Sequence, residues 1–325
     1  MFLFRNMLAV FLLLTSTLAL SATSEKEALA LLERMSTAIK TLNYEGVFVF
    51  IHGKQIETMH IVHSNVNGEE KERLLSLAGT PREILRTNDR LVCILPDSQS
   101  VVVEKSRPQN YLPAGLQRVT SDLKRYYNFS VEGKERMTGR EANVIKIYPK
   151  DPFRYGYQLW LDEQTDMLLK SDLVDENDEA VEQIMFTQIT IKDEILAERL
   201  EPTISSQGYK WFKEDKKIES AVKHKSHWSV VNLPAGYMQG MHKTHGLPTS
   251  RMPVEHLMFT DGISSVSVYI EEINNTKPMM KGFSSIGAVN AYTTVMSNHY
   301  VTVVGEVPKT AVKMIADSVR YKPVK

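Results

Sequence analysis

The first half of the chain, from residue 47 to residue 191, is a succession of short β-like runs joined by turns. Polar and glycine-containing turns separate the runs, among them His52-Gly53-Lys54 and Asn67-Gly68. The runs span 47–51, 56–62, 91–95, 100–103, 143–148, 157–161, 167–173 and 181–191. A parallel pair needs a crossover of about a dozen or more residues, so strands joined this closely are mostly antiparallel. The pattern predicts a large antiparallel meander that curls and leaves a concave apolar face to be filled or covered.

Two segments are expected to cover that face. The first is a helix that starts at Ser24, where Ser24 and Glu27 fit a capping box, and that ends at Asn43. Its apolar stripe consists of Leu29, Leu32, Met35, Ile39 and Leu42. The second is a helical loop over 106–127, in which Leu116, Val119 and Leu123 recur at helical spacing after two prolines and a glycine.

The first 22 residues have the pattern of a secretory signal peptide. Arg5 precedes a nearly unbroken apolar run from Met7 to Leu20, and small residues follow, so cleavage is expected after Ser21 or Ala22. The alternative is an uncleaved anchor, but about 14 apolar residues fall short of the roughly 20 that span a bilayer. We therefore expect the mature chain to be exported and soluble.

The periodicity fades between residues 201 and 226, which predicts a linker. Beyond it, strand-like runs at 228–231, 255–260, 264–270, 291–295 and 299–304 predict a second sheet. A last helix is expected to begin at Pro308-Lys309-Thr310 and to continue through Val319. The predicted domains are therefore 23–200 and 227–325, in an α+β fold with a large curved antiparallel sheet and a smaller C-terminal α/β domain.

Composition excludes several classes of function. Lys plus Arg and Asp plus Glu both number 39, and no block of five like charges occurs, which argues against a nucleic-acid binder. Cys93 is the one cysteine in the 325 residues, so an intramolecular disulfide, a CxxC pair and a cysteine-based metal site are excluded. Its apolar run predicts a buried, inert thiol.

The familiar catalytic and metal-binding motifs do not appear. Three His-x-x-His pairs occur, His60/His63, His224/His227 and His242/His245, but none has the His-Glu-x-x-His pattern. The first pair lies in a strand-like run that would turn its members to opposite faces, so surface or loop histidines are the preferred interpretation. The Gly282 to Gly287 segment has the wrong spacing for a nucleophile elbow and is predicted to be a flexible loop. We expect no metal, no cofactor and no enzyme activity, and a secreted hydrolase is the least favoured alternative.

Several segments together resemble the RseB/MucB family of periplasmic regulators of the sigma-E envelope-stress response. The most specific is Pro149 to Asp162, with Pro149-Lys150-Asp151-Pro152-Phe153-Arg154-Tyr155-Gly156-Tyr157 and Leu159-Trp160-Leu161-Asp162. The others include Asn43 to Phe50, Pro81-Arg82-Glu83-Ile84, Leu168-Leu169-Lys170-Ser171, Asn290-Ala291-Tyr292 and Val301 to Pro308. The resemblance covers essentially the whole mature chain.

The resemblance implies an N-terminal LolA-like half-barrel that senses lipid, in which helices cover an apolar cavity. It also implies a C-terminal domain that binds the anti-sigma factor. It also implies the function of a periplasmic negative regulator. Such a protein binds the periplasmic part of a membrane-bound anti-sigma factor of the RseA/MucA kind, shields it from proteolysis and releases it when mislocalised lipid or lipoprotein, including lipopolysaccharide, arrives. The rival hypothesis is that the protein is a carrier of lipoprotein or lipid. Whether the protein forms a homo-oligomer is left open.

Candidate residues follow from this hypothesis. The side chains predicted to line the cavity are Val47, Val49, Ile61, Leu91, Leu159 and Leu161 on strands, with Leu116 and Leu123 on the cover. Core packing is the alternative role for each, and an error of one residue along a strand would turn a set to the other face. Trp228, Tyr237 and Tyr292 are candidates for partner binding because aromatic residues are enriched in interface hot spots, with core burial as the alternative.

Overall fold

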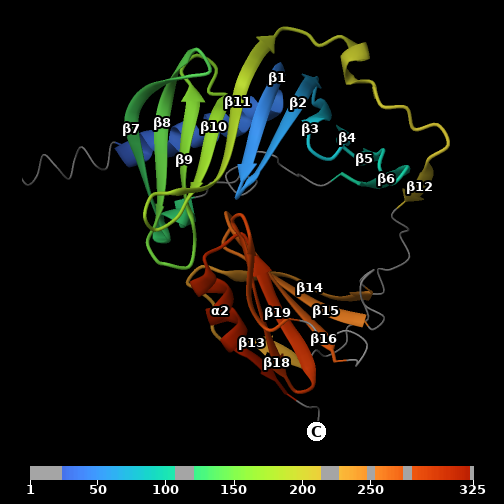
Figure 1. Ribbon diagram of the computed structural model, residues 1–325. Helices are drawn as coiled ribbons and strands as arrows, with labels where there is room; N and C mark the ends of the chain where they lie inside the picture. The colour runs from blue at the N-terminus through green and yellow to red at the C-terminus, as the bar shows by residue number, and fades with distance from the viewer. Residues whose placement is uncertain (1–23, 107–120, 214–226, 247–252, 274–279, 323–325) are drawn as a thin grey trace, which may run out of the picture.

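The structure is a computed structural model, and it describes residues 24–106, 121–213, 227–246, 253–273 and 280–322. The predicted signal peptide, Leu116 and most of the predicted covering loop lie outside the described residues. Figure 1 shows a large sheet with a helix across it and, below, a smaller sheet with its own helix. Among the described residues, neither helix combines the length and the apolar character needed to cross a membrane.

The predicted antiparallel meander is confirmed as a sheet of twelve strands in the order β12-β6-β5-β4-β3-β2-β1-β11-β10-β9-β8-β7. Neighbouring strands are antiparallel except β12, which runs parallel to β6. The strands are β1 (Asn43–His52), β2 (Gln55–Val66), β3 (Glu69–Ala78), β4 (Glu83–Thr87), β5 (Arg90–Leu95), β6 (Ser100–Lys105), β7 (Tyr127–Met137), β8 (Arg140–Pro149), β9 (Gly156–Asp162), β10 (Leu168–Val174), β11 (Ala180–Lys192) and β12 (Lys210–Lys213).

The first helix spans residues 24–41 and crosses one face of this sheet (Figure 1). Its apolar stripe packs into the main core cluster, where Leu32 and Met35 meet strand residues such as Phe48 and Leu159. The hydroxyl of Ser24 accepts a hydrogen bond from the Val131 N–H at 3.0 Å, so it fastens the start of the helix to β7. The capping box of Ser24 and Glu27 stays a prediction.

Part of the predicted linker is ordered against the sheet. Beyond the short 3-10 helix η3 (Ala197–Leu200), the backbone N–H groups of Thr203 and Ile204 donate to the buried carboxylate of Glu83 at 2.7 to 3.0 Å. Strand β12 then adds to β6, with Trp211 and Phe212 more than half exposed. The segment up to residue 213 is therefore held against the large sheet by hydrogen bonds to the Glu83 side chain and to the backbone of β6.

The C-terminal domain has a six-stranded antiparallel sheet in the order β14-β15-β16-β19-β18-β17 and a short β13-β20 pair. Its elements are β13 (Trp228–Val230), β14 (Met238–Gly246), β15 (Pro253–Thr260), β16 (Ser265–Glu272), β17 (Gly282–Ile286), β18 (Val289–Met296), β19 (His299–Gly305), α2 (Lys309–Asp317) and β20 (Val319–Tyr321). Two predictions here were wrong: residues 282–286 form strand β17 instead of a loop, and Val319 belongs to β20 instead of the last helix.

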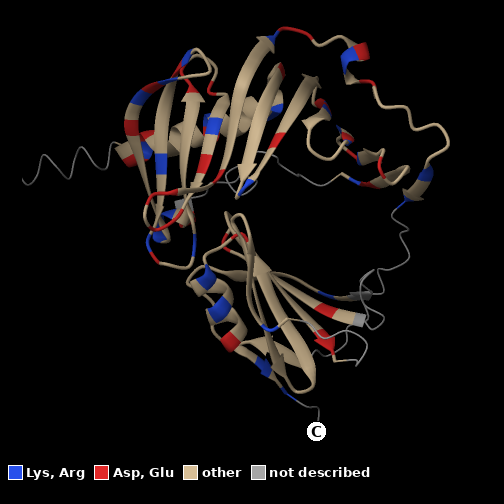
Figure 2. Ribbon diagram, in the orientation of Figure 1, with Lys and Arg blue, Asp and Glu red and all other residues tan. Residues whose placement is uncertain are grey.

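Charges of both signs are interspersed on the strands and loops of the large sheet (Figure 2). Many pair across neighbouring strands, as Arg86 does with Glu70 and Glu72. This pairing fits the equal numbers of acidic and basic residues.

Candidate functional site

The strongest candidate for a binding site is the apolar face between the large sheet and the first helix. Four predicted cavity residues, Ile61, Leu123, Leu159 and Leu161, lie together in its buried cluster. Leu123 belongs to the 3-10 helix η2 (Ser121–Arg125) and reaches the cluster from the far end of the predicted cover. Leu91 packs against the edge of the same cluster. A lipid-lining role for these side chains stays a prediction.

Val47 and Val49 lie apart from this cluster. They alternate along β1 with Tyr44, Phe48 and Phe50, which are the residues of β1 that pack into it. Side chains at adjacent positions of a strand point to opposite faces, so the two valines belong to the other side of the sheet. Both faces of β1 are apolar, which is why the sequence alone did not fix the parity.

The C-terminal domain closes part of this apolar face. Ile263, in the turn between β15 and β16, and Ala288, in the turn between β17 and β18, are both buried members of the N-terminal core cluster. Phe153, from the N-terminal domain, packs in return against the C-terminal core. The two domains therefore share apolar packing, and the two turns cover this end of the cluster.

A buried ion pair fixes the junction between the domains. Nη1 of Arg154 donates to Oδ2 of Asp261 at 2.7 Å, and both side chains are fully excluded from solvent. The Tyr127 hydroxyl donates to the same carboxylate oxygen at 2.9 Å, and Nη2 of Arg154 donates to the Ala235 carbonyl at 2.6 Å. Oδ1 of Asp261 accepts hydrogen bonds from the backbone N–H groups of Ile263 and Ser264 in its own turn. The charges of both Arg154 and Asp261 are therefore satisfied by hydrogen bonds.

Aromatic rings surround the guanidinium of Arg154. Its central carbon lies 5.2 to 5.4 Å from the ring centroids of Tyr126, Tyr127 and Tyr237, within the range of cation–π attraction. Burial and the neighbouring Asp261 carboxylate raise the pKa of Tyr127, which keeps its hydroxyl a donor. Tyr237, predicted as a partner contact, is thus buried between the two domains.

The other two partner candidates lie in the C-terminal domain. Trp228 is buried in the C-terminal core, with its ring 4.8 Å from that of Tyr321. Tyr292 is half-buried on β18 between the ring of Phe283, at 4.7 Å, and the ammonium of Lys313, at 5.0 Å from its centroid. Of the three, Tyr292 keeps accessible surface, and its role in partner binding stays a prediction.

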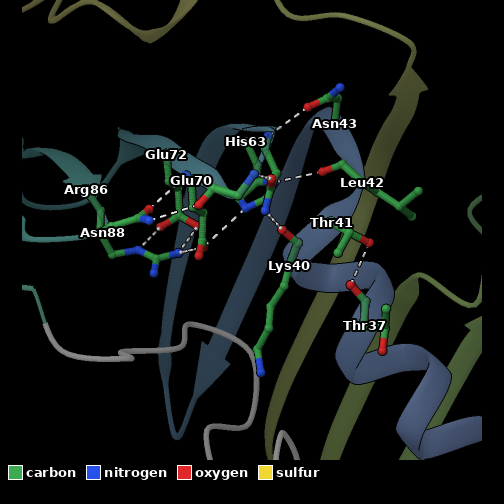
Figure 3. A network of polar contacts seen from close by, with 12 residues as sticks. Thr37, Lys40, Thr41, Leu42, Asn43, His63, Glu70, Glu72, Arg86 and Asn88 are labelled. Carbon is green, nitrogen blue, oxygen red and sulfur yellow. Dashed lines mark hydrogen bonds and ion pairs between the residues drawn. The ribbon is translucent and has the colours of Figure 1, made fainter.

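A polar network ties the end of the first helix to the sheet (Figure 3). The ring of His63 stacks on Tyr44 with centroids 4.7 Å apart, and its Nδ1 lies 2.8 Å from the Leu42 carbonyl. Its Nε2 lies 3.3 Å from Glu70. His63 is 1% exposed, so the prediction of a surface histidine was wrong for this residue, while His60 turns to the other face and contacts Glu45.

In the described part of the chain, His63, Glu70 and Glu72 are the group whose potential metal-ligand atoms lie within 4.8 Å of one another. Arg86 already occupies the position between the two carboxylates, at 2.6 Å from Glu70 and 3.0 Å from Glu72. A guanidinium there supplies the positive charge that a metal ion would bring. The network therefore has the chemistry of a structural ion-pair cluster.

Cys93 is partly buried on β5, where burial raises the pKa of its thiol. The predicted inert thiol is consistent with this environment because reactive cysteines need a lowered pKa. Sequence reasoning missed Asp261, Ile263 and Ala288, the turn residues that join the domains. The Asp261-Gly262 pair signalled a turn, but no local pattern showed that the turn enters another domain.

Comparison with known families gives matches to both domains. The model of the MucB/RseB N-terminal domain matches residues 27–204, and the model of the MucB/RseB C-terminal domain matches residues 222–320. The chain is 30% identical over 324 residues to the sigma factor AlgU regulatory protein MucB of Pseudomonas aeruginosa, covering 96% of each chain. It is 28% identical over 314 residues to the sigma-E factor regulatory protein RseB of Salmonella typhimurium, covering 94% of each.

Solved structures agree with this likeness. A complex of Pseudomonas aeruginosa MucA and MucB contains a chain that is 26% identical, with a TM-score of 0.71, over 92% of this chain and 100% of that one. A crystal structure of MucB with the periplasmic part of MucA matches with the same identity and TM-score over 91% of this chain.

Proposed function

This chain belongs to the MucB/RseB family, and from that premise we propose that it is a sigma-factor regulator that binds the periplasmic part of an anti-sigma factor. The observation that carries the proposal is the match of both domains, in order, to a family whose member MucB has been solved with MucA. The role is regulatory instead of catalytic. In this proposal the chain acts in the periplasm, and residues 1–22 are the signal for its export.

The finer proposal concerns release. Bound to this protein, the anti-sigma factor is shielded from proteolysis, and mislocalised lipid or lipoprotein reverses the protection. The apolar cluster of Ile61, Leu159 and Leu161 offers the environment that an acyl chain requires. A lipid can shift the equilibrium only if it binds the partner-bound and free states with different affinity.

We attribute this difference in lipid affinity to the shared packing of the two domains. An acyl chain that enters the cluster from the junction competes with Ile263 and Ala288 for the same apolar surface. Lipid binding thereby displaces turns of the C-terminal domain, to which we assign most of the partner contact. This coupling favours a regulator over a carrier, because a carrier needs the cargo site without a second domain that responds to it.

A binding experiment tests the proposal. Calorimetry would titrate the mature chain with the periplasmic fragment of the anti-sigma factor from the same organism, and the separately produced fragment 227–325 would be titrated in parallel. We expect saturable binding by the mature chain and weakened but measurable binding by the fragment. The absence of binding by the folded mature chain would overturn the regulatory function.

A further inference from the structure

The twelve-stranded and the six-stranded sheet each have two edge strands among the described residues, and three of these four edges are blunted. β7 carries four charged residues within 132–136 and has a register shift beside Gly133. β12 is four residues long and has a lysine at each end. β14 contains Lys243 and has a register shift beside Met241. Charges, bulges and short length of this kind keep an edge strand from pairing with another chain.

The fourth edge strand, β17, has none of these features. Its residues, Gly282–Ile286, include no charge and no proline, and its pairing with β18 has no register shift. Within the described residues, β18 is its one neighbouring strand. An exposed and uncharged edge is a template on which an extended segment can pair through main-chain hydrogen bonds. We therefore call β17 the open edge.

The turn after β17 determines which backbone groups face outwards. Ile286 pairs with Val289 across a two-residue turn, and the residues that close such a turn exchange hydrogen bonds with each other. Bonded and non-bonded pairs alternate along an antiparallel ladder, so Ser284 also bonds to β18, whereas Phe283 and Ser285 do not. The N–H and C=O groups of these last two residues therefore point away from β18, towards the open edge.

Apolar side chains flank the open edge on both faces of the sheet. On one face, the ring of Phe283 is 47% exposed and lies 4.7 Å from the ring of Tyr292, which the ammonium of Lys313 also contacts. On the other face, Ile286 and its cross-strand neighbour Val289 are 68% and 37% exposed. A strand added here would thus lay alternate side chains over an aromatic surface and over an aliphatic one.

The open edge ends at the junction of the two domains. Ala288, in the turn after β17, is buried in the N-terminal core cluster. A side-chain carbon at Gly287 would overlap the imidazole of His52 at the end of β1, so the backbone of the turn lies directly against the N-terminal domain. Asn290, which follows the turn, donates a hydrogen bond to the Tyr155 hydroxyl at 3.0 Å. One end of a strand added to β17 therefore lies beside the N-terminal domain.

We propose that an extended segment of the anti-sigma factor's periplasmic part binds to the open edge as an additional strand of the C-terminal sheet. The inference rests on the proposed function, which supplies the partner. The segment that fits has apolar side chains on both of its faces and no proline at the positions that donate hydrogen bonds to β17. The place of the edge at the junction favours this occupant, because a segment bound there can respond to changes in the packing of the two domains.

Amide hydrogen exchange, resolved by NMR for single residues, tests the inference. The full mature chain is measured alone and with a saturating amount of the periplasmic fragment of the anti-sigma factor from the same organism. We expect the amides of Phe283 and Ser285 to exchange fast in the free protein and to become at least about 10-fold more protected in the complex. The amides of Ser284 and Ile286 should be protected in both states.

Two variants at Ser285 isolate the contribution of the backbone. The Ser285 hydroxyl donates a hydrogen bond to the Asn290 side chain at 2.6 Å, and Ser285→Ala and Ser285→Pro both remove that bond. Ser285→Pro also removes the N–H group that faces the open edge, while the bonds to β18 remain. We expect the fragment to bind Ser285→Pro on the order of 10-fold more weakly than Ser285→Ala. Urea unfolding of both variants verifies that they fold.

The possible results separate this inference from the proposed function. If calorimetry shows saturable binding while the exchange of Phe283 and Ser285 stays unchanged, the partner binds elsewhere, so the inference fails and the regulatory function stands. Equal affinity of the two folded variants for the fragment has the same meaning. Protection that rises with protein concentration without the fragment would assign the open edge to a second copy of this chain and overturn the inference. If the fragment does not bind at all, both proposals fail.

Discussion

Arg154 and Asp261, 107 residues apart in the sequence, form an ion pair of 2.7 Å between the two domains, and neither side chain is accessible to solvent. Desolvation of two charges is costly, and it is repaid here by the additional bonds to the Ala235 carbonyl and the Tyr127 hydroxyl. The pair therefore forms only in the observed orientation of the domains, because its two charges come from different domains.

Replacement of Arg154 should loosen the junction. In Arg154→Met the Asp261 carboxylate stays buried without its cation, which costs about 3 to 5 kcal/mol of unfolding free energy. Denaturant titration measures the loss, and small-angle scattering measures domain separation. Arg34→Met, which removes an exposed pair with Asp166, should cost less than about 1 kcal/mol. Equal costs for the two variants would contradict the role of the buried pair.

Removal of the Glu83 carboxylate should release the segment that joins the domains. Glu83 is fully buried and accepts hydrogen bonds from the N–H groups of Thr203 and Ile204. Glu83→Ala leaves those donors without an acceptor and the buried Arg73 without its carboxylate, and we expect a loss of about 3 kcal/mol and faster limited proteolysis within 201–213. Glu57→Ala, which breaks a more exposed pair with Arg82, should leave the cleavage rate unchanged.

The contact between Gly287 and His52 can be separated from backbone strain by two glycine variants. Gly287 has a φ of +57° and Gly139 a φ of +77°, so alanine is strained by about 1 kcal/mol at either position. A side chain at Gly139 meets nothing within 4 Å, whereas at Gly287 it meets the imidazole. We expect Gly287→Ala to destabilise the protein by more than Gly139→Ala and to expose 287–290 to exchange. Equal destabilisation would show that this turn does not depend on His52.

Acid should weaken the N-terminal domain through Glu45. Burial raises the pKa of Glu45, but hydrogen bonds from Lys192 and Arg199 outweigh burial and bring the pKa down to about 2. A carboxyl with a lowered pKa contributes stability above its usual 4.5 that is lost as the pH falls towards 2. The unfolding free energy of Glu45→Gln should therefore fall less steeply over this range than that of the natural protein. Glu104→Gln, at an exposed carboxyl, should keep the natural slope.

The strands that sequence reasoning missed owe their form to their neighbours. β3 carries a charged run from Glu69 to Arg73, which has no alternation of apolar and polar residues. Glu70 and Glu72 are satisfied there by Arg86 of the adjacent β4. Charged residues of this kind support a strand only once the partner strand is in place. The strands β5, β8 and β9 were predictable because their own residues form the apolar runs that are typical of strands.

The junction was beyond prediction for a related reason. Asp261 and Ala288 lie in ordinary turns, and Arg154 lies in a segment that was notable for its resemblance to a family, without a physical role assigned. Their importance arises from an orientation of two domains that no local pattern encodes. The cavity residues show the same limit, because the choice between Val47 and Phe48 as inward-facing depends on the register of the whole sheet.

The central claim is that this protein shields an anti-sigma factor from proteolysis and that lipid reverses the shielding. It is tested most directly by the rate at which the protease that degrades the anti-sigma factor cleaves its periplasmic fragment. The rate would be measured for the fragment alone, with the mature protein, and with the mature protein plus lipopolysaccharide or an acylated lipoprotein peptide. The same peptide without its acyl chains serves as control. We predict slow cleavage in the presence of the protein and recovery of the rate with acylated ligands alone. Cleavage at the same rate with and without the protein would contradict the account.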